Sequence, residues 1–240
     1  MPTLLAVALL AYGAAATMQL ANTIPTVCGR LGLFSLWAIV TVYPWSLWLG
    51  PLATEWGLML IAMMTPLVSM HVASIAWSSR PTRRGVAVGS FLAAYWATWF
   101  AAIVVLVPMG IVLASAVGRV ADTPAAIAFA ACYSASPVAQ RARNLCHRTG
   151  PVPAFGLAIL MGSGKRGMMV GAYCIAACWP WMLVPMTVEA GHLPAMMLVG
   201  VYLFAERLAP PAPSRWRLPP AFTTIFGEVS RPIGTQLLHR

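Results

Sequence analysis

The stretch Gly167–Met186, GMMVGAYCIAACWPWMLVPM, decides the fold class expected of this chain. No charged residue occurs between Arg166 and Glu189. An α-helix needs about 20 predominantly apolar residues to cross the hydrocarbon core of a bilayer, and this stretch meets that length. We therefore predict a membrane-spanning helix here.

Four sulfur-bearing residues recur at every fourth position of this stretch: Cys174, Cys178, Met182 and Met186. Residues four apart lie on one side of an α-helix, so the sulfur atoms stack along it. Thiolate and thioether sulfur are the ligands that soft metals such as copper(I) prefer. Because Cys and Met are also ordinary packing residues, the pattern indicates either a soft-metal site or a sulfur-rich core.

The whole chain has the composition of a membrane protein. Of its 240 residues, 60% are hydrophobic and 8% are charged, and the mean hydropathy is +0.79. A soluble domain carries about 25% charged residues. We therefore predict an all-α fold, a polytopic transmembrane helical bundle with the lipid bilayer as its surroundings.

The formal charge of +10 does not indicate a nucleic-acid partner. No basic stripe interleaved with aromatic side chains is present to dock a nucleic-acid backbone. The five cysteines are an odd number, and at least three fall in apolar segments, so no disulfide framework is expected.

Seven apolar runs predict spans, with six spans as the alternative. These runs are 3–21, 31–49, 54–77, 86–108, 122–135, 167–188 and 193–209. The run 31–49 contains Pro44 and three tryptophans, so it either spans the membrane or lies at the interface. The run 122–135 is short and is expected to extend toward Val138. Residues 1–209 form the predicted membrane domain, and 210–240 form a Pro-rich, basic, extended or peripheral cytoplasmic tail.

Lys and Arg residues gather on one side of this predicted topology. With seven spans, that side holds Arg30, Arg80, Arg83, Arg84, Arg141, Arg143, Arg148, Lys165, Arg166 and the arginines of the tail. This asymmetry follows the positive-inside rule. It predicts an N-terminus outside, a cytoplasmic C-terminus and location in a bacterial inner (plasma) membrane.

The expected span 54–77 carries further sulfur. Met59, Met63 and Met70 fall on one face, with Met64 beside them and His71 adjacent. At about 1.5 Å rise per residue, the topology brings several donors to one depth in the outer half of the bilayer. These are Met59, Met63, Met182, Met186, His192 and Met196. We predict a Met-rich copper(I) site there, with Cys178 and Cys174 deeper.

Two features at or beyond the ends of the expected spans concern charge. Cys146 and His147 lie in the loop 136–166 among several arginines. Neighbouring cations favour thiolate, so Cys146 is either a reactive or ligating thiol or a reduced cysteine with no role. Glu206 ends the last span, and we expect it to pair with Arg207 or with a loop arginine.

Two glycine pairs at four-residue spacing, Gly85/Gly89 and Gly167/Gly171, open two of the expected spans. Small residues with this spacing allow helices to approach closely. We expect helix contacts at both pairs.

The order of these motifs resembles a family of predicted metal-binding integral membrane proteins, some described as copper chaperones associated with polyphenol oxidase maturation. The resemblance covers roughly residues 50–210. It lies in Trp56, Met59, Ala62-Met63-Met64-Thr65-Pro66, Met70, Pro137, Cys146, Gly171, Cys174, Cys178-Trp179, Met182, Gly191 and Glu206-Arg207. This chain departs from the family pattern at Ala142 and Ala177, where family members carry cysteine, and at Leu193-Pro194, where they carry Met-Asn.

Two functions are compatible with these features. The first is handling of copper(I) by Met, Cys and His ligands, as a copper chaperone for an enzyme outside the cytoplasm, with Cys146, Met64 and His192 among the candidate ligands. The alternative is a non-catalytic accessory or scaffold subunit of a larger membrane complex. A secondary transporter would show repeated halves, and no convincing internal match is found. No catalytic constellation is recognisable, so we do not expect an enzyme.

Overall fold

A computed structural model describes residues 2–20, 42, 44–117, 122–148, 156–188, 191–219 and 221–222. The regular elements in these ranges are helices, which confirms the all-α prediction. They are α1 (Pro2–Leu20), α3 (Trp45–Ser78), a short 3-10 helix η1 (Pro81–Arg83), α4 (Arg84–Val117), α5 (Asp122–Ala135), α6 (Pro137–Cys146), α7 (Gly156–Thr187) and α8 (His192–Leu208).

Three helical stretches are long and apolar enough to cross a membrane: Leu52–Ser78, Pro81–Val117 and Leu157–Thr187. Helices α1 and α5 contribute shorter apolar stretches. The count of seven spans and their orientation stay predictions. Most of the run 31–49 lies outside the described residues, and its last residues already belong to α3, which begins after Pro44.

Helices α5 and α6 are separated by a sharp break, so the expected extension of the short span toward Val138 is wrong. Ser136 is extended (φ −73°, ψ 153°), and its Oγ accepts a hydrogen bond from the Ala139 N–H at 3.2 Å. Proline disfavours the helical conformation in the residue before it, and it fits the first position of a new helix. The Ser136-Pro137 pair therefore ends α5 and starts α6.

Helix α7 begins at Gly156, well before Gly167. The segment 136–166 is therefore not a simple loop, because α6 and the first turns of α7 occupy most of its described part. Lys165 and Arg166 lie on α7 itself. The apolar residues GLAILM that begin α7 continue the helix upstream of these charges.

The contact between α4 and α7 depends on one of the two glycine pairs. A Cβ atom at Gly167 would lie 2.2 Å from the Phe91 carbonyl oxygen, and one at Gly171 would lie 3.0 Å from Thr98 Cβ. The close approach expected at this pair is confirmed. A Cβ atom at Gly85 or Gly89 would meet no neighbouring segment within 4 Å, so the expectation for that pair is wrong.

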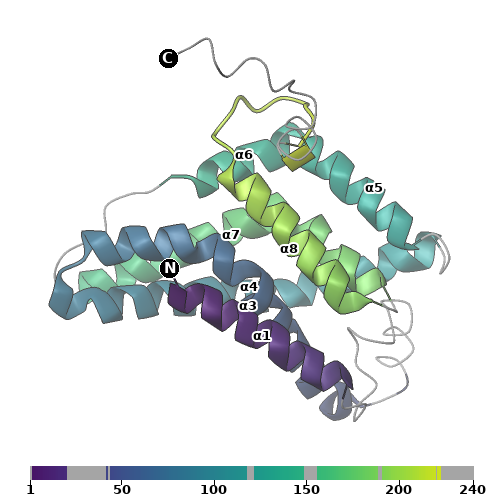
Figure 1. Cartoon of the computed structure of the whole chain (residues 1–240), viewed down its shortest axis with the longest axis horizontal. Helices are drawn as coiled ribbons and strands as arrows, with labels where there is room; N and C mark the ends of the chain where they lie inside the picture. The colour runs from purple at the N-terminus through teal and green to yellow at the C-terminus, as the bar shows by residue number, and fades with distance from the viewer. Residues whose placement is uncertain are drawn as a thin grey trace, which may run out of the picture.

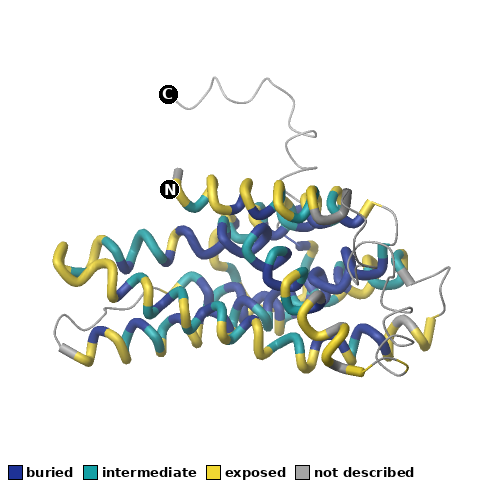
Figure 2. The backbone as a smooth tube through the Cα atoms, turned by 90° about the horizontal axis from the view of Figure 1, so that it is seen from below, coloured by how far each residue is buried: buried dark blue, intermediate teal, exposed yellow. Residues whose placement is uncertain are grey.

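Helix α7 packs against α4, α5, α6 and α8, whereas α1 lies along α3 (Figure 1). Buried residues gather where the helices overlap, and the free ends are exposed (Figure 2). Tyr133 of α5 donates a hydrogen bond at 2.6 Å to the Ala176 carbonyl. Pro180 cannot bond that carbonyl, because proline has no N–H, so Tyr133 satisfies it instead.

The first part of the tail is held against α6 without forming a helix. Asn144 exchanges two hydrogen bonds with the backbone of Ala212, at 2.7 and 3.2 Å. Arg217 donates through its backbone N–H to the Ala135 carbonyl and through its guanidinium to Gln140 Oε1. These contacts fix the first part of the tail beside α6. Helix α6 itself lies in the segment 136–166, which the sequence predicts to be a cytoplasmic loop.

Candidate metal site

Helices α3, α6, α7 and α8 line a partly open cavity of about 30 Å³. This volume is enough for at least one water-sized species. Three cysteines line it: Cys146 at the end of α6, and Cys174 and Cys178 on α7. All three are buried. The structure therefore brings together, from two helices, three thiols that belong to two separate motifs of the sequence.

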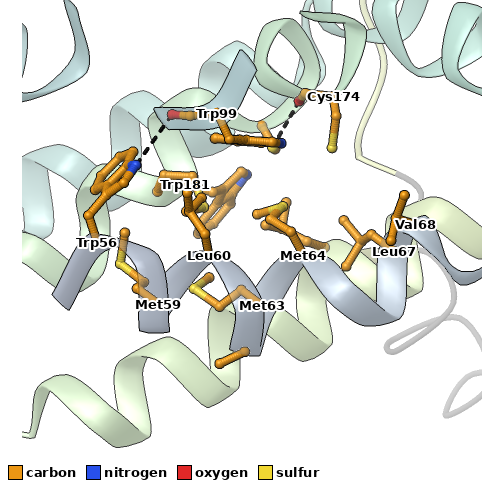
Figure 3. Close-up of a cluster of buried hydrophobic side chains, with 14 of the residues drawn as sticks. Trp56, Met59, Leu60, Met63, Met64, Leu67, Val68, Trp99, Cys174 and Trp181 are labelled. Atoms are coloured by element: carbon orange, nitrogen blue, oxygen red, sulfur yellow. Dashed lines mark hydrogen bonds between the residues drawn. The ribbon is translucent and has the colours of Figure 1, made fainter. Parts of the chain in front are cut away.

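Cys174 and Cys178 lie one helical turn apart, as their spacing predicts. The Cys178 thiol donates to the Cys174 carbonyl at 2.9 Å, and the Tyr95 hydroxyl donates to Cys174 Sγ at 3.6 Å. Figure 3 shows Cys174 extending from α7 toward the α3 face that carries Met64 and Leu67. Leu67 lines the same cavity.

The environment of the Cys146 thiol is set by burial more than by the arginines near it in the sequence. Burial raises its pKa to about 12, with a further contribution from Cys174 and only partial opposition from Arg207. Arg141 and Arg148 are exposed, and Arg143 is paired with a carboxylate. Of the two alternatives that the sequence leaves open, the burial and raised pKa of Cys146 favour an unreactive, protonated thiol.

We expect Cys146 in the folded protein to react with a maleimide at pH 7 at least about tenfold more slowly than in the chain unfolded in SDS, because only thiolate is nucleophilic. Raising the pH from 7 to 9 should speed labelling of the unfolded chain, because its Cys146 thiol passes through its ordinary pKa. It should speed labelling of the folded protein much less, because the folded thiol stays protonated. Mass spectrometry of the labelled peptide gives both rates. Equal rates in the two states would contradict this assignment.

A buried ion pair closes one side of the cavity. Arg143 Nη1 lies 3.0 Å from Glu206 Oε2, and both side chains are almost fully buried. Arg143 also donates to the Ser134 carbonyl and to Gln140 Oε1, while the Tyr202 hydroxyl donates to Glu206 Oε1. The expected pairing of Glu206 with a loop arginine is confirmed.

Arg207 occupies another part of the cavity wall and has neutral partners. Its guanidinium donates to the Cys146 carbonyl at 3.0 Å and contacts Nε2 of His71. A guanidinium has no acceptor, so His71 Nε2 is the acceptor and the neutral ring carries its proton on Nδ1. No motif in the sequence indicates this contact, because His71 and Arg207 are far apart along the chain.

The methionines predicted as ligands are buried but do not line the cavity. Met59, Met63, Met64, Met182, Met186 and Met196 belong to one hydrophobic core. Figure 3 shows the first three of them on α3. His192 is buried, and its Nδ1 lies 2.6 Å from the Pro185 carbonyl. Met70 is on the same face of α3 as Met59 and Met63 by its spacing but is 49% exposed, so neighbouring helices do not cover that part of the face.

The donor set suits a soft ion with few ligands. Among the described residues, no three His, Cys, Asp or Glu side chains form a group able to hold a metal ion. The three thiols thus surround the cavity without converging on one point. Zinc prefers a closed set of four thiolates and imidazoles. Copper(I), which accepts low coordination numbers and prefers sulfur, fits the pair Cys174 and Cys178 better.

Ala177 also lines the cavity, and Ala142 is buried nearby on α6. Ala177 is the position at which the family resemblance implies a cysteine directly before Cys178. A thiol at that position would project into the same cavity. The departure from the family pattern therefore lies in the wall of this site.

A family model described as PpoB2, copper chaperone, matches residues 53–229. This range holds the cavity-lining residues of α3, α6, α7 and α8. No curated protein and no solved structure matches the chain.

Proposed function

Because the chain belongs to the PpoB2 copper chaperone family, we propose that it is an integral membrane protein that binds copper(I) between the thiols of Cys174 and Cys178. It then passes the ion to a recipient enzyme outside the cytoplasm. The observation that carries this proposal is the cavity at which Cys146, Cys174 and Cys178 meet. Its size suits a single ion, and its sulfur donors suit copper(I).

Binding has a defined proton balance. The thiols of Cys174 and Cys178 must each release a proton to become ligands, and the copper(I) ion compensates one of the two negative charges that this leaves in an apolar interior. Cys178 Sγ at present donates to the Cys174 carbonyl. Loss of its proton ends that hydrogen bond and frees the sulfur to ligate.

Neutral thioethers provide a route away from this pair. Met182 and Met186 follow Cys178 at successive turns of α7, and both are buried. A thioether can bind copper(I) without adding an anion to the bilayer interior. Together with Met59, Met63, Met64 and His192, these residues form our proposed path toward the predicted outer side.

The proposed setting in a lipid bilayer is supported by three long apolar stretches and by apolar surface on the shorter helices. On α8, Leu198 is 73% and Val201 is 65% exposed. Large apolar side chains presented to water in this number would be unfavourable, whereas they suit contact with lipid. The copper chaperone description of the family supports the proposal of a recipient for the ion.

We expect the double variant Cys174→Ser/Cys178→Ser to lose copper(I) affinity by more than about 100-fold, because removing even a supporting partner of a metal ligand costs 10–100-fold. Competition with a copper(I) chelator measures the affinity, and elemental analysis measures the bound copper. Cys132→Ser is the matched control, because Cys132 is an exposed cysteine on α5. It should bind like the wild type.

The variant Ala177→Cys tests the same cavity by gain of a ligand. It should bind copper(I) more tightly than the wild type, since a third thiol enters the cavity wall. Unchanged copper binding in the double serine variant would refute the proposed ligand pair. A metal-free wild-type protein that copurifies with another membrane protein would favour the accessory-subunit interpretation instead.

A further inference from the structure

Arg207 supplies a positive charge to the cavity that no described carboxylate neutralises. Its partners are the Cys146 carbonyl and the neutral ring of His71. Its charge acts on Cys146, and Cys174 is within its electrostatic reach. These partners fix the position of the guanidinium and leave its charge uncompensated.

The other charged groups of the cavity wall cancel or are neutral. Arg143 and Glu206 form an ion pair with each other. His147 is only half-buried, and an imidazole with an ordinary pKa is mostly neutral at pH 7. The described cavity wall therefore has one excess positive charge, on Arg207.

We propose that Arg207 is the counter-charge of a copper(I) ion held by two thiolates, and that it makes this site selective for a monovalent metal. This role rests on the function proposed above. Two thiolates and one copper(I) ion carry a net charge of minus one, which Arg207 neutralises. Two thiolates and a divalent ion such as zinc are already neutral, so Arg207 would leave an excess positive charge.

The burial of the site makes this difference matter. An uncompensated charge in a low-dielectric interior is costly, and a nearby opposite charge offsets the cost. A guanidinium stays charged under all physiological conditions, so the compensation does not depend on pH. Because Arg207 touches backbone and ring atoms and ligates no metal, it acts as a positioning and specificity residue.

The test compares copper(I) and zinc affinities in the full-length protein with Arg207 replaced by Gln, Met or Lys. Arg207→Gln and Arg207→Met should lower copper(I) affinity by about 10–100-fold, the range typical of groups that support metal ligands. Zinc affinity should stay unchanged or rise. Arg207→Lys keeps the charge and should restore most of the copper(I) affinity.

The matched control is Arg148→Gln, an exposed arginine just beyond α6, which should change neither affinity. Equal losses for copper(I) and zinc, or no rescue by lysine, would overturn the proposal. The proposal would also be overturned if Arg207→Gln and Arg207→Met failed to fold while Arg207→Lys folded, because the charge of Arg207 would then be needed for folding. Suppose that the wild type and Arg207→Gln bind copper(I) equally well, whereas the double serine variant does not bind it. This inference then fails and the proposed function stands.

Discussion

Replacing Gly167 with alanine is expected to lower the free energy of unfolding by about 3 kcal/mol or more, at the upper end of what overpacking costs. The added Cβ would lie 2.2 Å from the Phe91 carbonyl oxygen, 3.0 Å from its carbon and 3.1 Å from the Tyr95 nitrogen. These are backbone atoms of α4, which cannot rotate away as a flexible side chain can. The two helices would have to separate along their contact.

Gly85→Ala and Gly89→Ala are the matched controls, because they add the same methyl group to α4 at positions where no neighbouring segment lies within 4 Å. Each should leave stability unchanged or raise it by up to about 1 kcal/mol, the gain expected when alanine replaces glycine in a helix. Thermal unfolding in one detergent, followed by circular dichroism, measures all three. Similar losses at Gly167 and Gly89 would contradict the close contact between α7 and α4.

A second consequence of Gly167→Ala concerns the cavity. Tyr95, whose backbone nitrogen would be crowded, donates its hydroxyl to Cys174. Displacing α4 from α7 should therefore also disturb the Cys174 thiol. Weaker copper(I) binding by any folded fraction of this variant is the expected result.

The glycine pairs show how far sequence spacing can lead. Spacing identifies residues on one face of a helix, and both pairs meet that condition. It does not tell which face meets a neighbouring helix, because that depends on packing between segments distant along the chain. Gly167 and Gly171 face α4, whereas Gly85 and Gly89 face open space.

The same limit applies to the candidate site. The four-residue spacing correctly placed Cys174 and Cys178 on one side of α7, since that property is local. Equal depth in the bilayer, by contrast, goes with six methionines in one hydrophobic core but not at the cavity. Met59 and Met70 share a face of α3, yet Met59 is buried and Met70 is exposed, because neighbouring helices cover only part of that face.

The contribution of α6 could have been recognised in part from the sequence. Ser136-Pro137 is a typical helix start, and Ala139, Arg143 and Cys146 then fall on one face of the following turns. All three are buried. The pairing of Arg143 with Glu206 could not be chosen over the other loop arginines, because the choice depends on how α8 packs against α6.

Removing the negative charge of Glu206 is expected to be among the most damaging single changes in the chain. Glu206→Gln should lower the free energy of unfolding by about 3 kcal/mol, because breaking a buried ion pair leaves an uncompensated charge. Arg143 would remain buried with only the Ser134 carbonyl, Gln140 Oε1 and the new amide as acceptors. Thermal unfolding in detergent measures the loss.

A double variant separates the charge from the packing. In Arg143→Met/Glu206→Met neither charge of this pair is left, so much of the stability lost in Glu206→Gln should return, as when a buried ion pair is replaced by apolar residues. Arg141→Gln, at an exposed position of the same helix, should change stability by less than about 0.5 kcal/mol. If the double variant is instead less stable than Glu206→Gln, the pair contributes net stability. The link between α6 and α8, and with it the position of Cys146 in the cavity wall, would then depend on the ion pair itself.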